Sequence, residues 1–165
     1  MKVGIISDTH DQITRITEAV TVFQKHEIQQ VFHCGDVTSL ANIQWFCAFQ
    51  ISLSFGNGDV LTGEMHQFLK ACNSKNQTGY QVETEIFGKK IGMTHSHLPN
   101  VLDKMIETQA YDYIFFGHTH IRSSRLIGKT RIINPGATGG LMKQTPSVCI
   151  LDLAKNIVLF EELGR

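Results

Sequence analysis

The chain has 165 residues, of which 42% are hydrophobic and 18% are charged, and its formal net charge is zero. This composition is ordinary for a globular protein and excludes a disordered chain. No run of Lys or Arg marks a nucleic-acid-binding surface, so we expect no sequence-specific binding of nucleic acid. No apolar stretch is long enough to span a membrane, and the N-terminus lacks the pattern of a secretion signal. The four cysteines are widely spaced, at Cys34, Cys47, Cys72 and Cys149. We therefore expect one domain over residues 1–165, located in the cytoplasm, away from membranes, with reduced thiols.

Predicted strands and helices alternate in the first part of the chain. Apolar runs at residues 3–7, 31–34 and 51–55 predict strands that are buried on both faces. Residues 13–26 have apolar side chains at helical spacing, and Ser39 is a candidate cap for a second helix. The order strand, helix, strand, helix, strand is typical of a parallel sheet with right-handed crossovers.

The rest of the chain favours hairpins. A short helix over residues 64–71 precedes a polar loop at 72–79, and another helix follows Pro99. Predicted strands cover, in chain order, residues 81–87, 90–94, 113–116, 121–127, 130–133, 147–153 and 157–161. Crossovers together with hairpins predict an α/β fold of two packed mixed β-sheets with helices on their outer faces, a four-layer αββα sandwich.

Seven candidate metal ligands lie at predicted strand ends in five segments of the chain. They are Asp8, His10, Asp36, Asn57, His95, His118 and His120. Ligands of open α/β sheets bind outside the carboxyl ends of the strands, and side chains two positions apart on extended chain share a face. Carboxylate, amide and imidazole ligands together indicate a site for two divalent metals, of the type that hydrolyses phosphoesters. Asp36, alone after its strand, suits a carboxylate that bridges two cations.

These segments resemble the motifs of the calcineurin-like metallophosphoesterases. The matches are Asp8-Thr9-His10, Gly35-Asp36, Gly56-Asn57-Gly58-Asp59, Thr94-His95-Ser96-His97 and Gly117-His118-Thr119-His120, with Asn134-Pro135-Gly136 as a further family loop. In its short length the chain looks most like the small single-domain bacterial and archaeal phosphodiesterases of that superfamily. The resemblance implies the same sandwich fold and hydrolysis of a small phosphodiester substrate.

The resemblance also implies a division of the ligands. One metal ion would be held by Asp8, His10, Asp36 and His120, and the other by Asp36, Asn57, His95 and His118. A hydroxide that bridges the two ions would attack phosphorus in line, without a covalent enzyme intermediate. Mn²⁺ is our first choice of metal, and Zn²⁺, Fe, Co²⁺ and Ni²⁺ also suit this ligand set.

One position departs from the family pattern. Many members carry a histidine directly after the motif asparagine, where it can protonate the leaving group, whereas this chain has Gly58. Proton delivery is then expected to fall to His97 or to water, and we count Asn57 and His97 as candidate catalytic residues. Acid catalysis typically contributes about 10²–10⁴-fold, so substrates with good leaving groups, such as aryl phosphodiesters, should suffer least.

Several alternatives stay open at this point. The enzyme alternative is a phosphomonoesterase of the same fold. The alternative of another class is a non-catalytic protein-binding scaffold, because the superfamily includes a protein-sorting subunit. Asp59 is either a helix cap near Thr62 or a catalytic residue, and His33 is expected to be a core histidine. Trp45 with its aromatic neighbours is core or a contact of a homo-oligomer.

Overall fold

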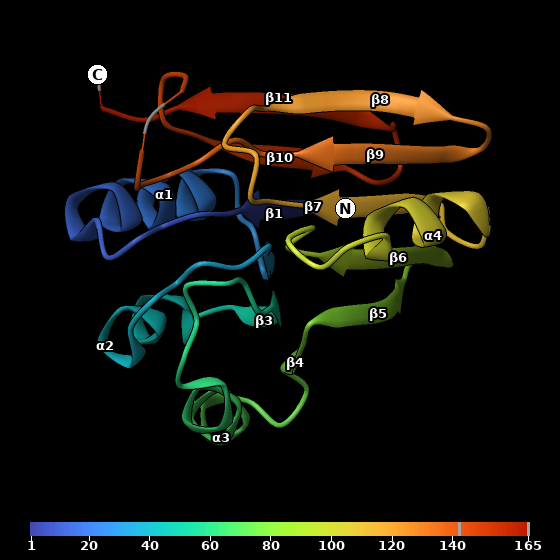
Figure 1. Cartoon of the computed structure of the whole chain (residues 1–165). Coiled ribbons are helices and arrows are strands. Elements are labelled where there is room, and N and C mark those ends of the chain that lie inside the picture. Colours follow the sequence, from blue (N-terminus) through green and yellow to red (C-terminus); the bar gives the residue numbers. More distant parts are fainter. Residues whose placement is uncertain (142, 165) are drawn as a thin grey trace.

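The computed structural model describes residues 1–141 and 143–164 (Figure 1). The elements are, in chain order, β1 (Lys2–Ile6), α1 (Ile13–Lys25), β2 (Gln30–His33), α2 (Leu40–Ile43), the short 3-10 helix η1 (Gln44–Phe46), β3 (Gln50–Ser54), α3 (Thr62–Cys72), β4 (Gln77–Gly79), β5 (Gln81–Ile86), β6 (Lys89–Thr94), α4 (Val101–Glu107), β7 (Tyr113–Phe116), β8 (Ser123–Ile127), β9 (Thr130–Asn134), β10 (Ser147–Asp152) and β11 (Ile157–Glu162). Among the described residues, no helix combines the length and the apolar character that a membrane crossing needs.

Six strands form the first sheet, in the order β11-β10-β1-β2-β3-β4. β1 to β4 run parallel to one another, and β10 and β11 pair antiparallel to their neighbours. The crossovers through α1 and α2 make the parallel order possible, because parallel strands cannot be joined by a tight turn. The carboxyl ends of β1, β2 and β3 therefore lie at one edge of the sheet, and Asp8, Asp36 and Asn57 follow these ends.

Five strands form the second sheet, in the order β5-β6-β7-β9-β8. β6, β7 and β9 are parallel, whereas β5 and β8 are the antiparallel hairpin partners of β6 and β9. His95 directly follows β6, and His118 lies two residues after β7. The second sheet thus delivers histidines from the carboxyl ends of two neighbouring strands.

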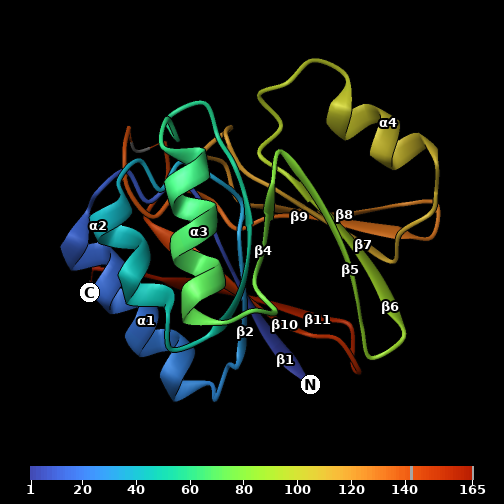
Figure 2. The same cartoon turned by 90° about the horizontal axis from the view of Figure 1, so that it is seen from below.

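Three hydrophobic cores of the described residues hold four layers together. Figure 2 shows α1, α2 and α3 on one side of the sheets and α4 on the other. Phe23 of α1 and Leu69 of α3 are fully buried in the core that the first sheet shares with its helices. Between the sheets, the rings of Phe32 and Phe115 meet edge to face with centroids 5.0 Å apart. Met105 fixes α4 to the second sheet. The predicted four-layer αββα sandwich is confirmed.

One strand differs from the prediction, because β4 lies inside the expected polar loop at residues 72–79. Its residues are polar and half-buried, so no apolar run announces the strand. The neighbouring Asn76 side chain is fully buried and bonds two separate elements. It accepts a hydrogen bond from the Ile51 N–H at 2.8 Å and donates one to the Leu69 carbonyl at 2.8 Å. Asn76 thereby ties α3 to β3 and brings β4 alongside.

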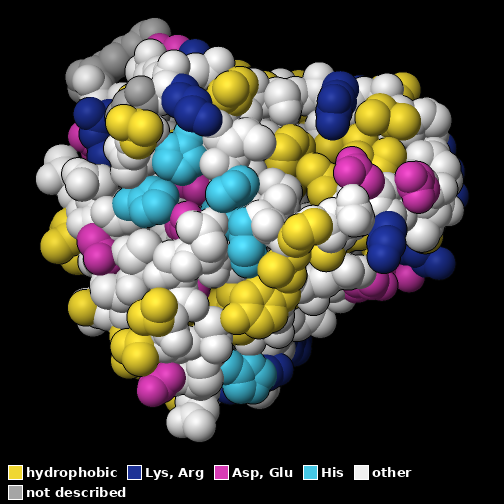
Figure 3. Space-filling view, viewed as in Figure 1, with side chains coloured by type: hydrophobic (Ala, Val, Ile, Leu, Met, Phe, Trp, Pro, Cys, Tyr) yellow, Lys and Arg dark blue, Asp and Glu magenta, His cyan; other side chains and the backbone are white. Residues whose placement is uncertain are grey.

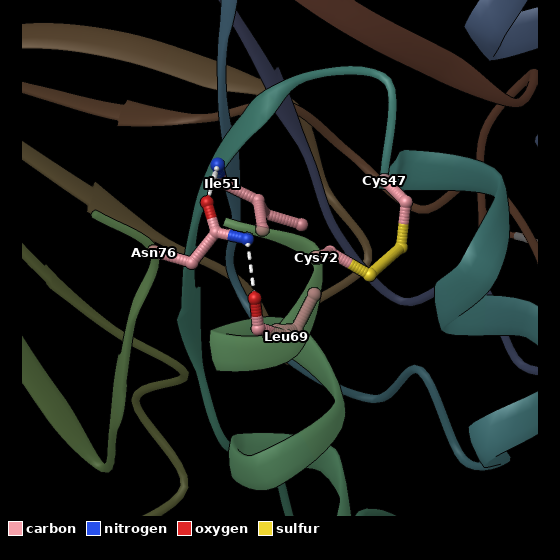
Figure 4. The surroundings of a disulfide bond; sticks show 5 residues. All are labelled: Cys47, Ile51, Leu69, Cys72 and Asn76. Atoms are coloured by element: carbon pink, nitrogen blue, oxygen red, sulfur yellow. Dashed lines mark hydrogen bonds between the residues drawn. A yellow bond between two sulfur atoms is a disulfide. The ribbon is translucent and has the colours of Figure 1, made fainter. Parts of the chain in front are cut away.

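The expectation of four reduced thiols is wrong for one pair. Cys47 and Cys72 form a disulfide, with their Cα atoms 5.7 Å apart, whereas Cys34 and Cys149 are free and buried. Figure 4 shows Cys47, just after η1, turned toward Cys72 at the end of α3. The 25-residue separation in sequence hides this proximity, which arises only because both helices cover the same sheet face.

The aromatic cluster near η1 is mainly core. Phe46 is fully buried and Phe49 is 5% exposed, whereas Trp45 is 40% exposed. Of these three residues, only Trp45 offers apolar surface to a second chain.

Candidate metal centre

The ligand-bearing strand ends of both sheets meet at one place. Asp8 and Asp36 come from the first sheet and are almost fully buried, and the fully buried His95 comes from the second. Figure 3 shows histidine side chains gathered on one face, with acidic atoms between them. The sandwich therefore assembles carboxylates from one sheet and imidazoles mainly from the other.

The backbone turns sharply at most of the ligand positions. Positive φ angles occur at Asp8 (54°), His10 (42°), Asp36 (57°), His118 (70°) and His120 (58°). Residues other than glycine rarely adopt this conformation, and where they do it often accompanies function. The Asp8 and His10 N–H groups donate to the carbonyls of Gly35 and Asp36 at 2.9 and 3.1 Å. These bonds hold the strand ends in the turned conformation.

Two glycines make room for the carboxylates. A Cβ on Gly56 would collide with the Asp36 carboxylate, and one on Gly117 would collide with the Ser7 hydroxyl and lie 2.7 Å from the Cys34 carbonyl oxygen. Both positions therefore require glycine for steric reasons, which explains why glycines accompany the ligands in the sequence.

A first cluster joins Asp8, His10 and His120, whose ligand atoms lie within 4.8 Å of one another. The Asp8 Oδ1 atom is 3.1 Å from His120 Nε2 and 3.9 Å from His10 Nε2. His120 donates from Nδ1 to the Leu141 carbonyl at 2.7 Å, which assigns the tautomer and leaves Nε2 free to ligate.

A second cluster joins Asp8, Asp36 and His95, again within 4.8 Å. His95 Nε2 lies 3.4 Å from Asp36 Oδ2 and 3.9 Å from Asp8 Oδ1, while His95 Nδ1 donates to the Cys34 carbonyl at 2.6 Å. Asp36 Oδ2 is also 3.5 Å from His10 Nε2. This oxygen therefore lies between a histidine of each cluster, and the other Asp36 oxygen accepts the Gly58 N–H at 2.7 Å.

The centre contains buried polar atoms that lack hydrogen-bond partners. Asp8 Oδ1, His10 Nε2 and His95 Nε2 have none among the described residues. Unpaired buried polar groups are costly, and these three atoms belong to residues of the two clusters, which have Asp8 in common. A divalent cation would satisfy them, and mixed carboxylate and imidazole donors suit such ions. The residues present therefore fit a metal.

The electrostatic surroundings of Asp36 favour its negatively charged form. Burial alone would raise its pKa, but the close approach and charge of the His95 ring, 3.4 Å away, together with the Gly58 N–H, lower the pKa to about 2. Burial opposes the charged form of His95 as well, yet the nearby carboxylates of Asp36 and Asp8 raise the His95 pKa. A metal must displace that proton, so metal affinity should fall as the pH falls.

Asn57, His118 and His97 lie at the rim of the centre. Asn57 and His118 are exposed, and the His118 ring is 5.1 Å from the His95 ring. Asn57 stands between two glycines whose added Cβ atoms would contact Asp36. The His97 ring lies 5.4 Å from that of His95, and burial, then the charges of His95 and His118, lower the His97 pKa. His97 is therefore mostly neutral at neutral pH.

Asp59 has a role that the sequence did not indicate. The interpretation as a helix cap is wrong, because α3 begins after Leu61 and has no side-chain cap. The buried carboxylate instead accepts N–H groups of Asp36 at 2.9 Å, Thr38 at 2.8 Å and Gly56 at 2.8 Å. Asp59 thus fixes the turns that carry Asp36 and Asn57.

Two further side chains support the ligand turns from behind. Fully buried His33 accepts the Gly35 N–H at Nδ1 and lies 3.2 Å from the Thr9 hydroxyl at Nε2, as expected for a core histidine. Burial lowers its pKa to about 4, so the ring is neutral. Asn134 donates to the Gly117 carbonyl at 3.2 Å and to the Thr119 hydroxyl at 3.0 Å. Asn134 therefore stabilises the turn that carries His118 and His120.

Comparisons with known proteins agree with this geometry. The family model for the calcineurin-like phosphoesterase superfamily domain matches residues 1–156. Phosphodiesterase MJ0936 of Methanocaldococcus jannaschii is 34% identical over 157 residues, which cover 94% of this chain and 95% of that relative. A solved structure of an archaeal phosphodiesterase, also 34% identical, has a TM-score of 0.93 and covers 99% of this chain and 100% of its own.

A more distant likeness concerns the fold alone. Vps29 of Entamoeba histolytica, solved in complex with zinc, is 19% identical with a TM-score of 0.72, covering 99% of this chain and 98% of its own. The same sandwich therefore occurs in proteins of quite different sequence.

Proposed function

Because the chain belongs to the calcineurin-like phosphoesterase superfamily, we propose that it is a metal-dependent phosphodiesterase acting on small diesters. The observation that carries this proposal is the convergence of buried Asp8, Asp36 and His95, whose facing ligand atoms include Asp8 Oδ1 and His95 Nε2 without hydrogen-bond partners. The relative that is 34% identical over nearly its whole length is named a phosphodiesterase, which supports diesters over monoesters.

We assign the ligands to two metal ions. Asp8, His10, Asp36 and His120 would hold one ion, and Asp36, Asn57, His95 and His118 would hold the other. Divalent ions bound there would polarise the phosphate oxygens and lower the pKa of a water molecule. The position of Asp36 Oδ2, 3.5 Å from His10 Nε2 and 3.4 Å from His95 Nε2, supports Asp36 as the shared ligand. Mn²⁺ is the proposed metal, ahead of Zn²⁺, Fe, Co²⁺ and Ni²⁺.

The exposed rim residues would meet the substrate. Asn57 and His118 are exposed beside the buried carboxylates, so a metal ion that they help to hold would be open to a phosphate. His97 would supply a ring N–H to the leaving oxygen. Because the His97 pKa is lowered, this assistance is weak at neutral pH, and esters with good leaving groups are the favoured substrates.

The test compares wild type with Asp36→Asn on an aryl phosphodiester after metal reconstitution. We expect the variant to lose about 100-fold or more of kcat/KM, because the ligand that both ions share is weakened. Asp112→Asn is the matched control, since Asp112 bonds the Lys90 N–H away from the centre, and it should retain activity. Undiminished activity of Asp36→Asn contradicts the two-metal assignment.

Two further measurements separate the alternatives. Parallel assays on an aryl monoester test the phosphomonoesterase, which would cleave the monoester faster than the diester. Negligible turnover of both esters together with tight binding of a protein partner would support the protein-binding scaffold instead.

The cytoplasm is the proposed location. The Cys47–Cys72 disulfide argues against this location, because disulfides are rare in cytosolic proteins. Thiol labelling of the protein taken directly from cells tests this point. Mainly oxidised Cys47 would indicate an oxidising compartment. We also propose that copies of the chain associate through the exposed Trp45, and the molar mass from light scattering tests this.

A further inference from the structure

A cavity of about 470 Å³ opens directly beside the metal centre. Ser96 and Thr119 line its near end, and each stands between two histidines of a ligand segment. A group esterified to a phosphate at the centre can therefore reach the cavity without leaving the protein surface. The volume is in the range of small-molecule sites, which run from about 300 to 1,000 Å³.

The walls change character along the cavity. Leu98, Leu102, Phe116 and Ile121 form apolar walls. At the far end stand Asp103 of α4 and Arg125 of β8, which also line a second cavity of about 500 Å³. Figure 3 shows this arrangement as hydrophobic side chains to the right of the histidines, bordered by acidic and basic ones.

The structure holds these walls in place before any ligand binds. Met105 and Phe116 are nearly buried in the core that fixes α4 to the second sheet. Ser96 donates its hydroxyl proton to the Gly117 carbonyl at 3.2 Å, and Asn134 binds the Thr119 hydroxyl at 3.0 Å. A preformed pocket loses little conformational entropy on binding, so it can contribute to selectivity.

We propose that this cavity is the subsite for a nucleoside group of the diester substrate. A nucleobase has two apolar faces and an edge that carries both donors and acceptors. The apolar walls suit the faces, while Arg125 can donate to carbonyl or ring nitrogen acceptors and Asp103 can accept from N–H groups of the edge. The inference rests on the proposed phosphodiesterase function and names its substrate class.

Other ester groups match the cavity less well. A glycerol group is too polar for walls that include Leu102 and Phe116, and an alkyl chain leaves the two charged side chains at the far end without a ligand partner. A flat ring with a polar edge uses both parts of the cavity.

The kinetic test compares two diesters that share one leaving group, the para-nitrophenyl diesters of thymidine and of methanol. We expect wild type to prefer the thymidine diester. Arg125→Ala and Asp103→Asn should each lower kcat/KM for that diester about tenfold, the effect of losing one charge-assisted hydrogen bond, and leave the methyl diester nearly unchanged. Lys129→Ala is the matched control, because Lys129 lies in the turn of the same hairpin and lines neither cavity.

Equal kcat/KM for both diesters in wild type, or equal losses on both in the variants, would overturn the proposal. A binding measurement keeps it testable if no ester is cleaved. Thymidine itself, which lacks a phosphate, is titrated into methyl-labelled protein and followed by NMR. Shifts of the Leu102 and Ile121 methyls that vanish in Ser123→Trp support the subsite even if the proposed activity fails. No shift in wild type refutes it even if hydrolysis is found.

Discussion

At the scale of single residues, the candidate centre is held by backbone N–H groups as much as by side chains. Asp59 accepts three such groups, from Asp36, Thr38 and Gly56. Thr38 itself has a φ of 72°, a strained value for a β-branched residue, and its N–H bond to Asp59 compensates for that strain. Asp59 therefore acts on the metal through other residues.

The first prediction concerns Asp59. Replacing it by Asn turns an acceptor of three hydrogen bonds into a group with one carbonyl oxygen, so the turns that carry Asp36 and Asn57 should loosen. We expect metal affinity to fall about 10- to 100-fold, as for other residues that orient ligands. Titration calorimetry with Mn²⁺ measures it, with Asp112→Asn as control. An unchanged dissociation constant would show that Asp59 does not position the ligands.

The second prediction concerns pH. The His33 pKa is about 4 in the folded protein and about 6.5 when unfolded, so the unfolded chain binds the proton first as the pH falls. His33 thus destabilises the fold progressively between pH 6.5 and 4, by up to about 3 kcal/mol, and has no such effect above pH 6.5.

His95 and His120 have raised pKa values, so their protonation stabilises the fold as the pH falls and opposes the effect of His33. The effect of His33 is therefore read from the difference in unfolding free energy between wild type and a His33 variant. Urea unfolding of metal-free wild type and His33→Gln should show wild type losing more stability than the variant as the pH drops through this window. Parallel curves would mean that His33 does not remain neutral in the fold.

The sequence predicted where the candidate ligands lie in the fold because they follow strand ends, and strand ends are visible as the limits of apolar runs. Asp8 and Asp36 illustrate this, since they come two and three residues after the ends of the buried strands β1 and β2. The work of Asp59 was not predictable, because its three partners come from turns whose conformation appears only in three dimensions.

At the scale of elements, helices and strands with strong periodicity were predicted within a residue or two, and the weak ones were not. α1 was expected over residues 13–26 and ends at Lys25, and β7 matches residues 113–116. β4 was missed because its three residues contain no apolar pattern. They form a strand because they pair with β3, next to Asn76, which bonds to β3. Tertiary contacts decide such elements.

The third prediction concerns the disulfide between η1 and α3. Closing a loop of 25 residues removes freedom from the unfolded chain and should stabilise the protein by about 3 kcal/mol. Reduction of wild type should therefore lower the unfolding free energy in urea by that order. Cys72→Ser should match reduced wild type and should not respond to reductant. Equal stability of oxidised and reduced wild type contradicts the prediction.

At the scale of the whole molecule, the two sheets are linked twice. Apolar side chains such as Phe32 and Phe115 join them in the interior, and the candidate ligands join them at one edge. Asp8 and Asp36 belong to the first sheet, while His95 belongs to the second. The sandwich itself was predictable from the mixture of crossovers and hairpins. Which strand ends would face each other across the sheets followed only from the resemblance.

The fourth prediction is that a bound metal ties the sheets together. At a Mn²⁺ concentration about 100 times the dissociation constant, the gain is about 2.7 kcal/mol, and for a chain of this size Tm should rise by about 5–10 °C. Differential scanning calorimetry with and without chelator measures the shift. Asp36→Asn removes the charge of the ligand that both proposed metal ions share, so the Tm shift of this variant should be much smaller. The same Tm shift in both proteins would place the stabilising metal elsewhere.

The left-handed turns at Asp8, His10, Asp36, His118 and His120 have a consequence for cofactor exchange. Hydrogen bonds within the chain fix four of these turns, because the N–H groups of Asp8, His10, Asp36 and His118 donate to Gly35, Asp36, Asp59 and Asp8. Divalent ions of similar size should then bind to one and the same arrangement of ligands. The identity of the working metal would be set by what the cell supplies more than by what the site prefers.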